Sequence, residues 1–447
     1  MRPTLLIWER QAIWMKRDAK HGLWVFALVA MALGLQIQPT LTLGSGEVRA
    51  SLSDLIGLLA APAALWFAWK CRALWNRRDV WVAALLVAGA TAVMTVSLIE
   101  AGMSSYGISG WALVKYAGWY VLVYYGLLGV LAGALAPEKA LQCFLRVFVL
   151  VHALLVIAFI VAQWCGFAWP GSASPRMAGL MDNPNAFGLS LLCSLALVIG
   201  AGEQVFSHRP ARFSVLLCAL LAAGVLFTRS LAGLAGLAVI AVIALVAQRD
   251  FTRVFLVACL AALLYVLPWA GNSVARMAGL PVQALHDGIG RKISNPDKYA
   301  FSITARLESN ARAIAMWRKD PALGAGLGAF YAKEKAAAEP GRQPLQIHNT
   351  LLWILAELGL AGALLFSALA VFAGATLVGA WRRLARVDLH ASSVALAGIM
   401  VLGAWATMCM AHELLYQRIP WIILGSVFGL VLWRQPEDLK DSDSART

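Results

Sequence analysis

The sequence predicts an all-α polytopic membrane protein with about 12 transmembrane helices and one large helical loop. Two observations lead to this fold class. Of the 447 residues, 61% are hydrophobic and only 13% are charged, whereas soluble domains carry about 25% charged residues; the mean hydropathy is +0.73. Apolar segments long enough to cross a membrane also recur along the chain. Too few polar side chains remain to cover a water-soluble surface, which excludes a soluble enzyme.

The elements follow in order. Residues 1–21 are basic and amphipathic, with no small-residue cleavage site after the span that follows, so we expect them to stay attached. A membrane helix needs about 20 mostly apolar residues. Such runs lie at 22–38, 52–69, 80–98, 111–135, 141–165, 186–201, 212–228, 231–247, 252–269, 350–380, 391–410 and 419–433. Helices 1–9 therefore occupy 22–269, helices 10–12 occupy 346–433, and a polar tail occupies 434–447.

The charge distribution predicts the orientation of these helices. With both termini in the cytoplasm, the cytoplasmic segments hold 21 of the 37 Lys and Arg residues, the short outer segments hold 5, and the segment 270–345 holds the other 11. Basic residues in short loops favour the cytoplasm, and long loops are largely exempt. The segment 270–345 is thus predicted to be a large periplasmic loop of a bacterial inner-membrane protein. The net charge of +14 then requires no nucleic acid partner.

Part of this loop is predicted to be helical, over residues 302–319. The pair Asp320-Pro321 would end the helix. Glu308 and Arg312 are four residues apart, which favours a surface ion pair. The apolar side chains near one face are Leu307, Ala311, Ile314 and Trp317.

The first candidate site is His348-Asn349-Thr350, directly before an apolar helix. Asn349 or Thr350 can serve as its N-cap. Beside a helix N-terminus, His348 would be neutral and able to accept a proton, and an anion could bind there. The alternative is a histidine that only packs at the loop–membrane boundary. Glu357 points away from His348 and is expected to bond another helix or to hold a catalytic group in place.

Arginines in short outer loops are the second candidate set. Arg176 precedes Asn183-Pro184, after which Asn185 is expected to cap the next span. Arg229 lies in a very tight turn between two spans, where its guanidinium could bind a phosphate bidentately. The alternative for both arginines is an orientation toward lipid headgroups. Arg306 and Arg312 lie on the predicted loop helix, where simple solvation is the alternative.

Other motifs favour no metal and no cofactor. His412-Glu413-Leu-Leu-Tyr416 resembles a zinc motif, but Tyr416 replaces the second histidine. The glycines of Gly324-Ala-Gly326-Leu-Gly328 do not follow a strand, which favours a tight turn over a dinucleotide site. The 7 cysteines include no C-x-x-C pair and are interpreted as core residues.

In this order, the clusters resemble the superfamily of O-antigen ligases and O-antigen polymerases. The matching pieces are Arg176…Gly179…Asn183-Pro184-Asn185, Thr228-Arg229-Ser230, Arg306 before Pro321-Ala-Leu-Gly324-Ala-Gly326, and His348-Asn349-Thr350-x-Leu352…Glu357-Leu358-Gly359. Asn310 stands where the family often has an aromatic residue, which leaves Arg312 as a competitor of Arg306.

The resemblance implies a membrane glycosyltransferase with its active site facing the periplasm. Its donor would be a glycan linked to undecaprenyl pyrophosphate, its acceptor a sugar of lipid A–core, and the transfer metal-independent and inverting. His348 would be catalytic, and arginines would bind the pyrophosphate. These arginines are Arg176, Arg229, Arg306 and Arg312. The residues expected to support the catalytic and binding side chains are Asn185, Asn349 and Glu357.

Several alternatives stay open. One large loop favours a ligase over a polymerase, and a protein O-oligosaccharyltransferase is a further member of the same superfamily. A transporter or flippase for an anionic lipid is the alternative of another class. Transporters often carry internal repeats and charges near the bilayer midplane, whereas this sequence has no fixed-period repeat and its notable charges cluster at one face. The donor glycan, the acceptor sugar and the oligomeric state are not determined by the sequence.

Overall fold

The structure is a computed structural model of the full chain. The residues that it describes are 24–38, 40–43, 46–59, 62, 78–104, 107–136, 138–165, 176–181, 183–206, 211–277, 296–338 and 344–433.

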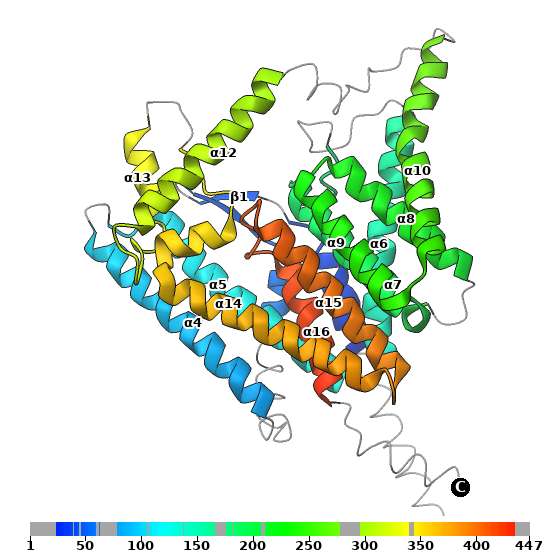
Figure 1. The fold of residues 1–447 in the computed structure, drawn as a ribbon, viewed down its shortest axis with the longest axis horizontal. Helices are drawn as coiled ribbons and strands as arrows, with labels where there is room; N and C mark the ends of the chain where they lie inside the picture. Colours follow the sequence, from blue (N-terminus) through cyan, green and yellow to red (C-terminus); the bar gives the residue numbers. More distant parts are fainter. Residues whose placement is uncertain are drawn as a thin grey trace, which may run out of the picture.

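The described chain is almost entirely helical (Figure 1). An apolar helix, Trp24–Gly34, comes first, and two short strands follow, β1 (Thr40–Leu43) and β2 (Gly46–Arg49). The labelled helices are α4 (Arg78–Met103), α5 (Gly110–Leu135), α6 (Glu138–Trp164), α7 (Pro184–Val205), α8 (Ala211–Thr228), α9 (Leu231–Gln248), α10 (Phe251–Met277), α12 (Pro296–Trp317), α13 (Ala329–Ala337), α14 (Thr350–Leu384), α15 (Leu389–Cys409) and α16 (Arg418–Trp433).

The predicted fold class is confirmed. Among the described residues, eight helices are long and apolar enough to cross a membrane. Three shorter apolar helices match further predicted spans, namely Trp24–Gly34, Phe251–Val266 and Arg418–Leu432. The span predicted at 52–69 is described only at 52–59 and 62, and the segments predicted at 1–21 and 434–447 lie outside the described residues.

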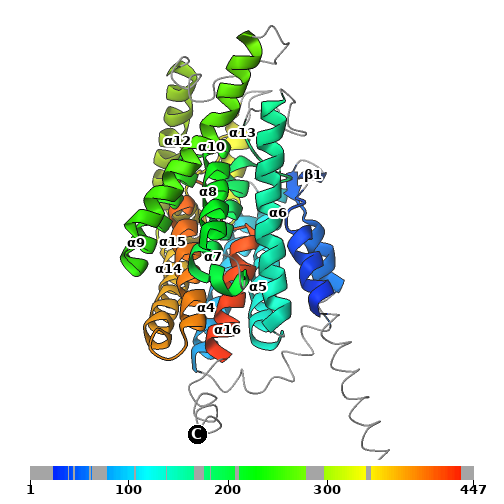
Figure 2. The same ribbon diagram turned by 90° about the vertical axis from the view of Figure 1, so that its right-hand side faces the viewer.

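The long helices run along a common direction, and the elements of the predicted loop lie at one end of them (Figure 2). Helices α12 and α13 and the strand β1 are found at this end, which we call the loop end. In Figure 1, α14 lies between α4 and α15 and contacts both. Of the predicted loop 270–345, residues 278–295 and 339–343 lie outside the described residues.

A small hairpin was not predicted. Strands β1 and β2 pair antiparallel, with Thr40 opposite Arg49 and Leu43 opposite Gly46. Four residues per strand are too few to span a bilayer, for which about 9–11 are needed. The hairpin therefore leaves the helical fold class unchanged.

The helix predicted at 302–319 is confirmed as α12, which ends before Pro321. The predicted ion pair of Glu308 with Arg312 is also present. The predicted apolar face, in contrast, was wrong. Leu307 is 64% exposed. The buried side chains are Ser309, Ala313 and Met316. Small side chains let α12 approach α14 closely, so the contact face is set by fit and not by the largest apolar residues.

Helices α5 and α16 are held together by glycines. A Cβ atom on Gly133 would lie 2.0 Å from the carbonyl oxygen of Ser426, and one on Gly429 would lie 2.1 Å from that of Val130. Close backbone approach at small residues is a general way of packing helices inside a membrane, where apolar side chains gain little from contact with each other. This packing fixes α5, which carries part of the site described below.

Helix α14 is interrupted at Gly359, whose φ is 64°. The freed backbone groups bond the segment that follows α12. The N–H of Leu360 donates to the carbonyl of Pro321 at 2.9 Å, and the N–H of Ala325 donates to the carbonyl of Ala356 at 2.9 Å. Buried backbone groups need such partners. The kink therefore attaches the loop end directly to a membrane helix.

The glycine-rich segment is the tight turn that its sequence predicts. Gly324, Gly326 and Gly328 have φ values of 81°, 93° and 76°, which residues with a Cβ atom rarely adopt. A Cβ atom on Gly324 would also lie 2.6 Å from the backbone nitrogen of Gly359. Only glycine permits both the turn and its contact with the kink of α14.

Candidate active site

Helices α7, α9 and α14 begin at the loop end, and each has a side-chain cap. Asn183 caps α7 by accepting from the N–H of Asn185 at 2.9 Å, so the prediction that Asn185 is the cap was wrong. Pro184 takes the first helical position, which suits its missing N–H, so the cap is the residue before it. Ser230 caps α9, and Asn349 caps α14. Such N-termini favour anions.

Asn185 instead holds Arg176. Its Oδ1 accepts from Nη2 of Arg176 at 3.0 Å, and Nε of Arg176 donates to the carbonyl of Thr228 at 2.8 Å. Both partners are neutral, so they orient the guanidinium without cancelling its charge. Burial, followed by the charges of Arg229 and Arg306, lowers the pKa of Arg176 below its ordinary value.

Three of the four predicted arginines are thus brought together. Arg229 lies in the two-residue turn between α8 and α9 and has a φ of 52°, an unusual conformation for a residue other than glycine. Arg306 lies on α12, far away in sequence, yet its charge acts on Arg176. Like charges at close range repel each other. This arrangement concentrates positive charge beside helix N-termini.

Arg312 lies six residues after Arg306 but has a different environment. Its Nη2 is 2.5 Å from Oε1 of Glu308, and its Nη1 is 2.7 Å from Oε2 of Glu334. These contacts raise the pKa of Arg312. The structure therefore separates the two competitors: the charge of Arg306 acts on Arg176 and on both histidines, whereas the charge of Arg312 is balanced by two carboxylates.

His348 directly precedes the N-cap of α14 and lies beside a second histidine, His412, from the loop between α15 and α16. Their ring centroids are 6.2 Å apart. Thr350 donates to the carbonyl of His412 at 2.9 Å, and Asn349 donates to the carbonyl of Met410 at 2.9 Å. The start of α14 therefore holds the two histidine-bearing segments together. We call Arg176, Arg229, Arg306, His348 and His412 the arginine–histidine cluster.

Both histidines are held neutral. Burial, followed by the charge of Arg306, lowers the pKa of His348. Burial and the charges of Arg306, His348 and Arg176 lower the pKa of His412 to about 3. The Nδ2 of Asn185 lies 3.5 Å from Nδ1 of His412 and links this ring to Arg176. A neutral imidazole can accept a proton, and the arginines beside it can bind an anion.

Glu357 has no described contact with His348 and accepts from three donors, two of which lie on other elements than its own helix. Its Oε2 accepts from the N–H of Gly328 at 2.8 Å and from Nε1 of Trp353 at 2.6 Å, and lies 3.3 Å from Nζ of Lys115 on α5. The side chain of Glu357 is 1% exposed and that of Lys115 is 4% exposed. Glu357 thus joins α5, α14 and the glycine turn.

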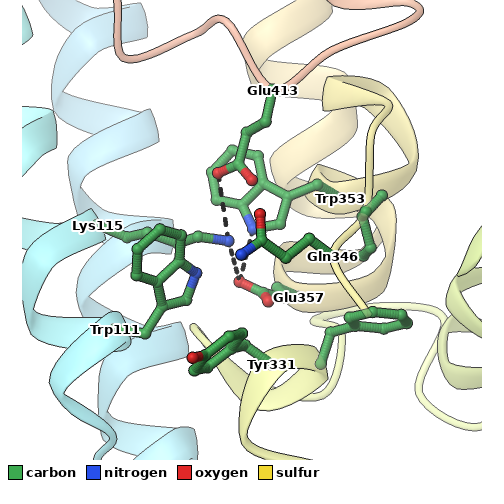
Figure 3. Close-up of a pocket in the computed structure, with 9 residues that line it drawn as sticks. Trp111, Lys115, Tyr331, Gln346, Trp353, Glu357 and Glu413 are labelled. Atoms are coloured by element: carbon green, nitrogen blue, oxygen red, sulfur yellow. Dashed lines mark hydrogen bonds and ion pairs between the residues drawn. The ribbon is translucent and has the colours of Figure 1, made fainter. Parts of the chain in front are cut away.

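Lys115 also lies 3.4 Å from Oε1 of Glu413, the residue after His412. Figure 3 shows its ammonium group between the two carboxylates. Burial raises the pKa of Glu413 even though Lys115 opposes this effect. This buried network connects the histidine-bearing loop to α5 and α14.

A small pocket with room for about one water molecule lies among these groups. We call it the aromatic pocket. Its aromatic side chains include Trp111, Tyr331 and Trp353 (Figure 3). Its polar side chains are Lys115, Gln346, Glu357 and Glu413.

Sequence reasoning missed His412 and Lys115. The segment His412-Glu413 was examined only as a zinc motif, and among the described residues no three His, Cys, Asp or Glu side chains come together as metal ligands do. Lys115 is one of the five basic residues that the sequence analysis assigns to the short outer segments, but it lies inside α5. A lysine within an apolar segment is rare and usually functional or paired, and this signal could have found it.

Comparison with known families matches residues 216–367 to the family described as O-antigen ligase. Residues 216–367 are therefore similar to that family. The matched segment runs from α8 to α14 and includes Arg229, Arg306, His348 and Glu357. Among curated proteins, no match is found. This match supports the predicted superfamily over the segment that it covers.

Proposed function

We propose that the protein is an O-antigen ligase of the bacterial inner membrane. It transfers a polysaccharide from undecaprenyl pyrophosphate to a sugar hydroxyl of lipid A–core, in lipopolysaccharide biosynthesis. The observation that carries this proposal is the gathering of Arg176, Arg229 and Arg306 around two neutral histidines at three helix N-termini. A pyrophosphate supplies negative charge to Arg176 and Arg306, since no described carboxylate lies within ion-pair distance of either.

The reaction follows from these positions. The acceptor oxygen attacks the anomeric carbon of the donor glycan and forms the new glycosidic bond. The bond from that carbon to the pyrophosphate oxygen breaks, and the pyrophosphate leaves with the electron pair. Attack from the opposite face inverts the anomeric configuration. His348 takes the proton from the acceptor hydroxyl, a role that requires a neutral imidazole.

The arginines stabilise the leaving group. Charge develops on the bridging oxygen as the bond breaks, and fixed positive groups that already face this position stabilise the transition state. Asn185 orients Arg176, and Asn349 holds the start of α14 against the loop of His412. We propose that three arginines supply the charge that a divalent metal supplies in other pyrophosphate chemistry, so that transfer needs no metal.

The site would face the periplasm. Basic residues are concentrated in the segments predicted to be cytoplasmic, 21 against 5 in the short outer segments, and this bias orients membrane proteins. A reporter active only outside the cytoplasm, such as alkaline phosphatase, should be inactive when fused after Trp433 and active when inserted after Leu323. The reverse pattern would place the site in the cytoplasm.

The proposal is tested by a transfer assay in detergent. Purified protein, undecaprenyl-pyrophosphate-linked glycan and lipid A–core are mixed with a chelator, and the joined product is followed on a gel. We expect product in the presence of the chelator and none without either substrate. Transfer does not need two closed compartments and can be measured in detergent, whereas a transporter would give no product.

Other outcomes would contradict the proposal in distinct ways. Longer lipid-linked glycan without transfer to lipid A–core would indicate a polymerase. Product only after addition of Mg²⁺ or Mn²⁺ would retain the ligase but remove the metal-independent mechanism. No change in either substrate by folded protein would favour a protein acceptor or a transport function.

A further inference from the structure

The arginine–histidine cluster contains a second imidazole, that of His412, for which the proposed reaction has no role. We propose that His412 binds a phosphate oxygen of the pyrophosphate through the Nε2–H group of its neutral ring. The two histidines then have opposite roles, because His348 accepts a proton and His412 donates a hydrogen bond. The inference rests on the proposed function for the identity of the ligand, and it follows from the hydrogen bonds that fix the tautomer of His412.

The backbone that carries His412 is held on both sides. Thr350 donates to its carbonyl at 2.9 Å, and the N–H of His412 donates to the carbonyl of Met408 at 3.0 Å. Farther along the same loop, Nε1 of Trp405 donates to the carbonyl of Leu414 at 3.0 Å. A group that is already fixed before the ligand arrives loses little freedom on binding, as in other preorganised sites.

The amide of Asn185 has one orientation that suits both of its neighbours. Nη2 of Arg176 can only donate a hydrogen bond, so the atom that it contacts at 3.0 Å is Oδ1 of Asn185. The amide nitrogen, Nδ2, is therefore the atom that faces Nδ1 of His412, at 3.5 Å. Arg176 is itself held by the carbonyl of Thr228, which fixes the direction of this chain of contacts.

This amide decides which nitrogen of the His412 ring carries the proton. An amide NH2 group donates and does not accept, so Nδ1 of His412 presents a lone pair. A neutral imidazole with an unprotonated Nδ1 carries its proton on Nε2. The imidazolium form is disfavoured because burial, followed by the charge of Arg306, lowers the pKa of His412 to about 3. Nε2 is therefore a donor.

His348 differs from His412 in this respect. Among the described residues, neither ring nitrogen of His348 has a hydrogen-bond partner, so either can present the lone pair that a base needs. Nε2 of His412 also has no partner within the described part of the chain. The side chain of His412 is only half-buried, so this N–H group remains available to a ligand.

The charges around His412 restrict the ligand that this N–H group binds. The positive charges of Arg306 and Arg176 act on His412, which favours an anion over a cation or an apolar group. Phosphate oxygens are strong acceptors, and a pyrophosphate has enough of them for the arginines and for His412. A neutral donor adds a hydrogen bond without the like-charge repulsion that an imidazolium would add.

Binding is measured without transfer, by titration calorimetry of the full chain in detergent. The probes are inorganic pyrophosphate and undecaprenyl pyrophosphate. His412→Phe keeps an aromatic ring and removes the donor, so it should weaken binding of pyrophosphate about 10- to 100-fold, as expected for one hydrogen bond to a charged group. His390→Phe is the matched control, because His390 lies in the first turn of α15, at the end away from the cluster; its binding should equal that of the original protein.

A glutamine distinguishes hydrogen-bond donation from proton transfer. His412→Gln retains an N–H donor, so it should weaken binding clearly less than His412→Phe does. In the transfer assay, His412→Gln should likewise be more active than His412→Phe. The same substitution at His348 should be as harmful as His348→Ala, because an amide does not act as a general base.

The tautomer is read directly by nitrogen NMR of protein that carries isotope-labelled histidine. The signals of His412 are identified by their loss in His412→Gln. We expect a protonated Nε2 and an unprotonated Nδ1 in the original protein. Because the tautomer is measured on the original protein, an unprotonated Nε2 would refute the inference even if His412→Phe does not fold.

The outcomes separate the inference from the proposed function. Equal binding by His412→Phe and the original protein, equal losses in His412→Gln and His412→Phe, or no binding of either probe would overturn the inference. Transfer to lipid A–core by the same preparation would then leave the proposed function standing. Binding that depends on His412, without any transfer, would retain the inference and overturn the proposed function. Such dependence with undecaprenyl pyrophosphate identifies a lipid-linked ligand, and dependence with inorganic pyrophosphate alone identifies a free one.

Discussion

Two polar clusters lie next to each other at the loop end, and they treat charge in opposite ways. The arginine–histidine cluster brings three guanidinium groups together with two neutral rings. The aromatic pocket places a single ammonium group, that of Lys115, between two carboxylates. In the first cluster, Arg176 and Arg306 have no described carboxylate within ion-pair distance, whereas the charge of the second is largely neutralised within the protein.

This difference indicates that the first cluster binds a ligand and that the second holds the fold together. A cluster of like charges lowers the stability of the fold unless a ligand compensates for it, which is typical of functional sites. A buried ion pair costs desolvation free energy that its attraction repays only with good geometry, so it contributes mainly when both partners stay in place. Substitutions in the two clusters should consequently affect different quantities: catalysis in the first, and the free energy of unfolding in the second.

The largest expected effect concerns catalysis. His348→Ala should reduce transfer at least about 100-fold, the contribution typical of a general base, because the attacking hydroxyl loses the group that takes its proton. The rate is measured in the detergent transfer assay, and insertion is checked by the amount of protein in the membrane. Normal transfer by a correctly inserted variant would exclude His348 as the catalytic residue.

The next effect concerns stability. Lys115→Met should lower the free energy of unfolding by about 3–5 kcal/mol, because it leaves buried carboxylates without their cation. The measurement is thermal unfolding in detergent. Arg312→Met is the comparison: Arg312 is 46% exposed and its partner Glu308 is 50% exposed, whereas its second partner Glu334 is 7% exposed. Exposed pairs contribute about 0–1 kcal/mol, so the loss should be smaller than that of Lys115→Met.

A second variant tests the cause of this loss. The triple variant Lys115→Met/Glu357→Gln/Glu413→Gln removes the orphaned charges and should recover part of the stability, because neutral amides are less costly to bury than unpaired carboxylates. If the triple variant is no more stable than Lys115→Met, the loss comes from packing and the ion-pair interpretation fails.

A smaller effect distinguishes two arginines of one helix. Arg306→Gln should slow transfer about 10- to 100-fold, as expected for the loss of a charge-assisted hydrogen bond to phosphate. Arg312→Gln should slow it less than about threefold, since Arg312 already pairs with Glu308 and Glu334. The comparison uses kcat/KM for the lipid-linked donor. Equal losses in both variants would mean that the structure does not discriminate between the two residues.

The sequence was sufficient for the membrane architecture and for the chain-local parts of the site. Apolar runs predict spans because a bilayer requires about 20 apolar residues in succession. Asn349 was recognisable as a possible cap because a helix start is encoded within a few residues. The tight turn at Arg229 and the glycine turn at Gly324 were predicted for the same reason.

Contacts between distant segments were not predictable. Nothing local shows that His412 lies beside His348, because this contact depends on hydrogen bonds from the start of α14 to the loop before α16. The choice between Arg306 and Arg312 likewise depends on Glu334, which comes from another helix. A single sequence specifies which side chains are available, and long-range packing decides which of them meet.

The smallest expected effect is a shift in pH dependence. Burial and the charge of Arg306 lower the pKa of His348 below its ordinary value of 6.5. A general base must be unprotonated, so kcat/KM should decline on the acid side only below pH 6.5. Arg306→Gln removes one of the two causes and should move this decline to higher pH. Arg312→Gln should leave it in place, because Arg312 does not contribute to the shift of His348. A decline that stays fixed in Arg306→Gln would show that the titrating group is not His348, even if transfer is slowed.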